Sequence, residues 1–132
     1  MAAPLAPRSI ARILLVNDDP TVADSCARAL RLDGHEVWAA LSADDGLRLA
    51  RTHAPHAVVV DVRTPLASAL GLVETLRRLP QLAVAPIAVV SGDRHPTRAT
   101  LEQLSALGIQ VRYKPLWLNE LVALSRSLVR PA

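Results

Sequence analysis

Five short aliphatic runs, separated by longer segments with helical periodicity, constrain the fold of this chain more than any other feature of its sequence. The runs are Arg12–Val16, Glu36–Ala40, Ala57–Val62, Ile87–Val90 and Ile109–Tyr113. Three of them are almost continuously aliphatic and rich in β-branched residues, which is typical of strands buried on both faces of a parallel sheet. Five strand–helix units in 132 residues therefore predict one α/β domain, a doubly wound parallel sheet with right-handed crossovers.

The helical segments begin and end with residues suited to those positions. Asp19 and Pro20 predict an N-cap followed by a first-turn proline, and Gly34 closes that helix. Ser42, with Asp45 three residues later, resembles a capping box in which Asp replaces the usual Glu or Gln. The end of the third helix and the beginning and end of the fourth are predicted at Pro80, Pro96 and Gly108. Residues 1–9 contain two prolines and no periodicity, so we expect a flexible tail before a domain over residues 10–130.

Composition narrows the class of protein. The chain is 51% hydrophobic but has no Phe, so its core must be aliphatic. Its only cysteine, Cys26, falls on the apolar side of a predicted helix, which indicates a buried side chain; the absence of a possible internal disulfide suits a reducing cytoplasm. The net charge of +3 comes from scattered arginines, so no direct nucleic-acid contact is expected. No apolar run reaches the roughly 18 residues of a spanning helix, so no membrane insertion is expected either.

Polar side chains follow four of the five predicted strands at the point where each strand ends. The first strand ends in Asn17 and Asp18, the third in Asp61, the fourth in Ser91 and the fifth in Lys114. Ligands of doubly wound folds bind outside the carboxyl ends of the strands, where the strand order reverses. If the order is 2-1-3-4-5, strands one and three are neighbours. Asp18 and Asp61 then lie side by side, with Ser91 and Lys114 on the flank.

This combination of side chains indicates phosphoryl chemistry. Two neighbouring carboxylates repel each other unless a cation lies between them, and oxygen ligands in a partly open shell favour Mg²⁺. A nearby lysine balances charge when a phosphoryl group arrives, and a serine hydroxyl can donate to a phosphoryl oxygen. The residues therefore point to an aspartate nucleophile that takes a phosphoryl group with the help of a metal ion.

Four sequence motifs lie at the strand ends. They are Ile-Leu-Leu-Val-Asn-Asp-Asp-Pro over 13–20, Val-Val-Val-Asp-Val-Arg-Thr-Pro over 58–65, Ala-Val-Val-Ser-Gly over 88–92 and Tyr-Lys-Pro-Leu over 113–116. These motifs resemble those of receiver domains of the response-regulator family. Each motif is weak alone, but the four in this order and at these separations are specific, and the resemblance covers about residues 10–130. It implies the flavodoxin-like sheet with strand order 2-1-3-4-5.

The resemblance also implies a role for each matching residue. Asp61 matches the aspartate that accepts a phosphoryl group from a histidine kinase or a phosphotransfer protein. Asp18 matches a direct Mg²⁺ ligand, and Arg63 matches the position whose backbone carbonyl coordinates the metal. Ser91 and Lys114 match the residues that bind the phosphoryl group. A cis peptide bond is expected before the proline that follows this lysine.

The acidic pair departs from the family pattern. The first residue of the pair is Asn17, which removes one negative charge from the metal site. An amide oxygen can still reach a metal through water, so we expect weaker Mg²⁺ binding rather than none. Asp19 could form the pair with Asp18, but it makes a better N-cap before Pro20, and we retain Asp18 as the ligand.

The fifth strand and two loops depart from the pattern as well. The family often has Tyr or Phe three residues before the lysine, where this chain has Val111. Tyr113 shares that face of the strand and is a possible substitute, with simple packing as the alternative. The segment from Pro65 to Gly71 is longer than usual, and the segment from Gly108 to the lysine is shorter.

Our functional hypothesis is a phosphoacceptor receiver domain and not an enzyme that turns over a substrate. Phosphorylation would change the face formed by the fourth helix, fifth strand and fifth helix, through which the domain would contact a downstream protein or form a homodimer. The chain would act alone or as part of a longer protein. The alternative is a pseudo-receiver that serves as an interaction module without phosphorylation, which Asn17 and Val111 motivate. A flavin-type small-molecule carrier is a further alternative, disfavoured by the crowded, charged strand ends.

Overall fold

The computed structural model describes residues 11–62 and 65–129, in which strands and helices alternate. The strands are β1 (Arg12–Val16), β2 (Glu36–Ala40), β3 (Ala57–Val62), β4 (Ile87–Ser91) and β5 (Ile109–Tyr113). The helices are α1 (Pro20–Leu32), α2 (Ala43–His53), α3 (Leu70–Arg78), α4 (Arg98–Ala106) and α5 (Leu118–Val129). Two short 3-10 turns, η1 (Leu66–Ala69) and η2 (Pro80–Leu82), precede and follow α3. The predicted tail over residues 1–9 lies outside the described residues.

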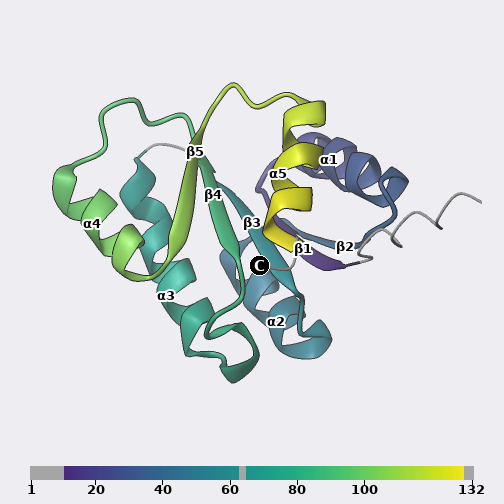
Figure 1. Cartoon of the computed structure of the whole chain (residues 1–132), viewed down its shortest axis with the longest axis horizontal. Helices are drawn as coiled ribbons and strands as arrows, with labels where there is room; N and C mark the ends of the chain where they lie inside the picture. Colours follow the sequence, from purple (N-terminus) through teal and green to yellow (C-terminus); the bar gives the residue numbers. More distant parts are fainter. Residues whose placement is uncertain (1–10, 63–64, 130–132) are drawn as a thin grey trace, which may run out of the picture.

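All strand pairs are parallel, and the sheet has the order β2-β1-β3-β4-β5. This confirms the predicted doubly wound sheet. The strand order reverses between β1 and β3, so the carboxyl ends of these two strands lie together at the switch point. Figure 1 shows α1 and α5 on one side of the sheet and α3 and α4 on the other.

Two aliphatic cores fill the space between the sheet and its helices. One face of the sheet packs against α2, α3 and α4, and the other packs against α1 and α5. In β3, Val58 and Val60 belong to the first core, and Ala57 and Val59 to the second. Because side chains alternate along a strand, Asp61 points to the α1–α5 face.

The predicted boundaries are confirmed at α1, at the start of α2 and at the end of α4, but the predicted start of α4 is wrong. Asp19 Oδ1 accepts hydrogen bonds from the backbone N–H groups of Thr21 and Val22, and Ser42 Oγ accepts one from Asp45. Pro96, predicted to start the fourth helix, lies before its N-cap. Thr97 is that cap: its hydroxyl accepts from the Thr100 N–H, so α4 begins at Arg98. The strand predicted to end at Val90 extends by one residue.

The long segment between Pro65 and Gly71 has a structural explanation. Residues Leu66–Ala69 of this segment form η1, which leads directly into α3. Leu66 and Ala69 of this turn are buried against the α2–α3–α4 core. The insertion therefore shapes the edge of the sheet next to Asp61 rather than forming a loose loop.

Two glycine substitutions test the backbone of the fold. Neither Gly34 nor Gly71 has an atom within 4 Å of an added Cβ, but Gly34 has φ +99° whereas Gly71 lies in α3. We expect Gly34→Ala to destabilise the protein by about 1 kcal/mol through backbone strain. Gly71→Ala should stabilise it by about 0.5 kcal/mol through helix propensity. Urea unfolding measures both; a loss of stability in both variants would contradict this account.

Candidate functional site

Asp61 and Lys114 form an ion pair at the carboxyl edge of the sheet. Lys114 Nζ lies 2.6 Å from Asp61 Oδ1 and 3.4 Å from the Val62 carbonyl oxygen. The Asp61 side chain is 20% exposed and that of Lys114 is 38% exposed, so the pair is partly shielded from water yet open to a ligand. The Lys114–Pro115 peptide bond is cis, as the resemblance implies, and the Lys114 N–H donates to the Ser91 carbonyl.

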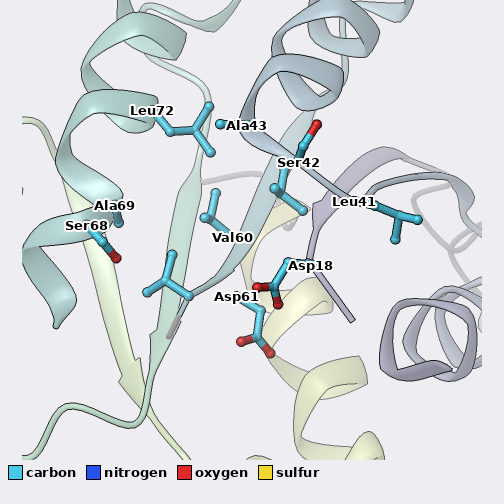
Figure 2. A pocket seen from close by; sticks show the side chains of 11 residues that line it. Asp18, Leu41, Ser42, Ala43, Val60, Asp61, Ser68, Ala69 and Leu72 are labelled. Atoms are coloured by element: carbon cyan, nitrogen blue, oxygen red, sulfur yellow. The ribbon is translucent and has the colours of Figure 1, made fainter. Parts of the chain in front are cut away.

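The three polar residues after β1 occupy different positions: two form local hydrogen bonds with the backbone, and one lies at the site. Asp19 serves as the N-cap of α1, whereas Asp18 is exposed and lines a cavity together with Asp61. Figure 2 shows the carboxylates of Asp18 and Asp61 on the same side of this cavity. Asn17 is buried, and its Oδ1 accepts a hydrogen bond of 2.9 Å from the Asp19 N–H. The structure thus brings Asp18 and Asp61 together and turns Asn17 toward its own backbone.

The environment of Asp61 raises the pKa of its carboxyl group. Burial is the main cause, the ion pair and hydrogen bond with Lys114 oppose it, and the negative charge of Asp18 adds to it. The carboxylate of Asp61 is therefore held at a cost in free energy that a cation or a covalent modification can relieve.

Cavities open on both sides of Asp61. One has a volume of about 230 Å³ and lies toward α2 and α3, where Ser42, Ser68 and Leu72 also line it. The other, of about 400 Å³, lies between α1 and α5 and is mostly apolar. Cys26 packs against the α1–α5 core, as the predicted buried side chain implies, but it also lines the second cavity and is only partly buried. Trp117, 67% exposed, stands at the same cavity.

The donor set fits Mg²⁺ better than a softer metal. No group of three or more His, Cys, Asp or Glu side chains that could hold a metal occurs within residues 11–62 and 65–129. Mg²⁺ keeps several waters and is bound through one or two carboxylates, so Asp18 and Asp61 are the residues that could hold it. Arg63, expected to contribute a backbone carbonyl, lies outside the described residues.

Ser91 and the fifth strand lie on the flank of the site. Ser91 is fully buried at the end of β4, and it pairs with Tyr113 of β5 in the sheet register. Val111 packs against the α2–α3–α4 core, whereas Tyr113 is 46% exposed. The side chain at 111 therefore has a packing role, and Tyr113 lies at the surface next to Ser91.

Asp93 is a site residue that the sequence reasoning missed. Its backbone N–H donates to Ser91 Oγ at 3.0 Å, and its carboxylate accepts from the Leu66 N–H at 2.8 Å. The signal available in the sequence was an acidic residue two positions after a serine that ends a strand. That spacing suggests a local turn but does not reveal a bond to the β3–α3 segment.

Comparisons of the sequence with protein families and with curated proteins agree on one family. The response regulator receiver domain family matches residues 13–125. The chain is 34% identical over 119 residues to the transcriptional regulatory protein PrrA of Mycobacterium tuberculosis and to the response regulator MprA of a Mycobacterium species, covering 90% of this chain and 50% of each relative. The chain thus spans about half the length of these curated relatives.

Solved structures share the fold. The chemotaxis protein CheY4 of Vibrio cholerae is similar with a TM-score of 0.78 and 20% identity, over 91% of this chain and 99% of that one. A response regulator protein from Burkholderia multivorans is similar with a TM-score of 0.70 and 31% identity, over 93% of this chain and 98% of that one. No helix in the described part of this chain is long and apolar enough to cross a membrane.

The raised pKa of Asp61 has a measurable consequence for stability. Because the folded-state pKa lies above the unfolded value, ionised Asp61 destabilises the fold above that pKa, and the penalty disappears as the pH falls through it. We expect Asp61→Asn to raise Tm by a few degrees at pH 7, with a gain that shrinks in acid. Thermal unfolding across pH measures this; Asp24→Asn, at an exposed position of α1, is the control, and an unchanged or lower Tm for Asp61→Asn would contradict the argument.

Proposed function

Because this chain belongs to the response regulator receiver domain family, we propose that it accepts a phosphoryl group on Asp61 in two-component signalling. The observation that carries the proposal is the placement of Asp61 between Lys114, at 2.6 Å, and a cavity that Asp18 also lines. A carboxylate nucleophile, a cation for the incoming charge and a second carboxylate for a metal are thereby present at one edge of the sheet.

In the proposed reaction, the Asp61 carboxylate attacks the phosphorus of a phosphohistidine on a histidine kinase or phosphotransfer protein. An oxygen lone pair of Asp61 forms the new O–P bond, and the electron pair of the breaking N–P bond returns to the imidazole of the donor. The product is an aspartyl phosphate. Because the phosphorylated Asp61 carboxyl group no longer carries the carboxylate charge, Lys114 can pair with phosphoryl oxygens from the position it already occupies.

The other residues hold and orient the reacting groups. Asp18 and Asp61, with the carbonyl of Arg63, would hold Mg²⁺, which when bound offsets the negative charges that gather during transfer. Ser91 would donate its hydroxyl proton to a phosphoryl oxygen. Asn17, buried and bonded to the Asp19 N–H, would contribute at most through water.

The biological setting follows from this chemistry. The domain would act as a signalling switch in the cytoplasm, with a histidine kinase or phosphotransfer protein upstream. Its output would pass through the face formed by α4, β5 and α5 to a protein target or a second copy of the chain. Two of the similar proteins are named as a transcriptional regulatory protein and a response regulator, which supports a regulatory output.

A second candidate is an interaction module that keeps the fold without phosphorylation. Two observations favour it: Asn17 is bonded to its own backbone, and Val111 is a packing residue where the family often has an aromatic side chain. The ion pair between Asp61 and Lys114 supports the phosphoacceptor instead, and labelling separates the two candidates.

We expect one phosphoryl adduct on the wild-type protein after incubation with Mg²⁺ and acetyl phosphate. The adduct should be absent from Asp61→Asn and reduced at least tenfold when Mg²⁺ is removed with EDTA, because the metal offsets the charge of the transferring group. Intact-mass spectrometry measures the adduct. A wild-type protein that stays unlabelled under conditions that label another receiver domain supports the interaction module.

Restoring the acidic residue at position 17 should strengthen metal binding. Asn17→Asp adds a carboxylate beside Asp18, and we expect Mg²⁺ affinity to rise by about tenfold, equivalent to about 1.4 kcal/mol. Calorimetric or fluorescence titration with Mg²⁺ measures the change. Asn119→Asp, at an exposed position in the first turn of α5, changes the net charge equally and should leave the affinity unaltered. Equal affinities for Asn17→Asp and the wild type would place position 17 outside the metal site.

A further inference from the structure

Asp93 connects two loops at the edge of the sheet. It lies in the loop after β4, where its backbone N–H donates to Ser91 Oγ at 3.0 Å. Its Oδ2 accepts from the Leu66 N–H at 2.8 Å, across 27 residues of sequence, and its Oδ1 accepts from the His95 N–H at 3.0 Å. One residue thus contacts the serine of the site with its backbone and the β3–α3 segment with its side chain.

The β3–α3 segment depends on this contact. Leu66 is the first residue of η1 and is fully buried, and the N-cap of that turn is Pro65, which makes no side-chain hydrogen bond to it. Asp93 supplies the missing acceptor from another loop. The two backbone donors stabilise its carboxylate and lower its pKa, so Asp93 is ionised at neutral pH and its hydrogen bonds are charge-assisted.

Val62 and Leu66, which lie before and after Arg63 in the sequence, both contact residues 91–93. Before it, Val62 pairs with Ser91 in the register of β3 and β4. After it, Leu66 is bonded to Asp93. Residues 91–93 therefore contact both the last residue of β3 and the first residue of η1.

The hydroxyl of Ser91 is the group through which a change at Asp61 can reach Asp93. Its oxygen accepts from the Asp93 N–H, and its single proton remains to be donated. A rotation or shift that brings the hydroxyl to a phosphoryl oxygen on Asp61 moves the oxygen relative to the Asp93 N–H. Val111 has no ring that could follow such a movement, whereas Asp93 is bonded to the oxygen itself.

We propose that Asp93 is a positioning residue that couples Ser91 to η1, so that a phosphoryl group on Asp61 loosens the hydrogen bond between Asp93 and Leu66. This inference rests on the proposed phosphoacceptor function. Ser68 and Ala69 of η1 line the cavity beside Asp61, so the coupling carries the signal to the α3 side of the site. Because η1 lines the same cavity as Asp61, loss of the Asp93–Leu66 bond should also alter the lifetime of the phosphoryl group on Asp61.

Amide hydrogen exchange at Leu66 tests the proposal in the intact chain. In the unphosphorylated protein, Asp93→Ala should speed exchange of the Leu66 amide about tenfold or more, because a hydrogen bond to a charged acceptor is lost. Asp93→Asn, which keeps the size and one acceptor, should give a smaller increase. Arg94→Ala, at an exposed position of the same loop, is the matched control, and the amides of Val59 and Val89 in the sheet report that each variant is folded.

The second part compares each protein before and after labelling with acetyl phosphate and Mg²⁺. In the wild type, labelling should speed exchange of the Leu66 amide about tenfold. In Asp93→Ala, labelling should change this exchange little. The lifetime of the phosphoryl adduct on Asp93→Ala should also differ from its lifetime on the wild type. A labelled wild type with unchanged Leu66 exchange overturns the role of Asp93 and leaves the phosphoacceptor function intact. A wild-type protein that takes no adduct overturns both the phosphoacceptor function and the coupling role of Asp93. Comparison of Leu66 exchange in the unlabelled wild type and Asp93→Ala still shows whether Asp93 holds η1.

Discussion

The structure depends on the burial of a parallel sheet on both of its faces. The central strands β1, β3 and β4 are almost entirely buried and leave no face for polar side chains, so these gather where the strands end. In this chain the register of β1, β3, β4 and β5 brings the strand ends together, and Asp18, Asp61, Ser91 and Lys114 meet there. The same burial that stabilises the sheet shields the Asp61–Lys114 ion pair and raises the pKa of Asp61. Burial of the sheet therefore underlies both the stability of the fold and the environment of Asp61.

Much of the fold could be predicted because its signals are local. Aliphatic runs define strands covered on both faces, and four of the five strand bounds are as predicted. Asp19 and Ser42 were predictable as caps because capping is decided within three residues. The start of α4 was not, because a first-turn proline at Pro96 and an N-cap at Thr97 are both reasonable readings of the sequence. The hydroxyl of Thr97, which reaches the Thr100 N–H, decides between them.

The candidate site was predictable only where it follows from strand ends. Asp18, Asp61, Ser91 and Lys114 come directly after strands, so topology alone brings them together. Asp93 was missed because its bond to Leu66 spans 27 residues and joins two irregular segments, which no periodicity encodes. Cys26 was expected to be buried because it lies on the apolar side of α1; it does pack against the core, but it also lines the cavity between α1 and α5 and is therefore only partly buried. Sequence patterns give the face of a helix, not whether the space beside it is filled.

The net charge at the site decides what the departure at Asn17 would mean for the proposed phosphoryl chemistry. An acidic residue at position 17 would add a third negative charge beside Asp18 and Asp61, against the single positive charge of Lys114. With Asn17 the three ionised groups sum to −1, so Lys114 can remain paired with Asp61 at 2.6 Å before any cation binds. In the proposed reaction, phosphoryl charge would replace the carboxylate charge of Asp61, and Lys114 would need only a small movement to pair with it. We therefore expect Asn17 to weaken the attraction for Mg²⁺ but to leave Lys114, which would pair with the phosphoryl oxygens, already in place.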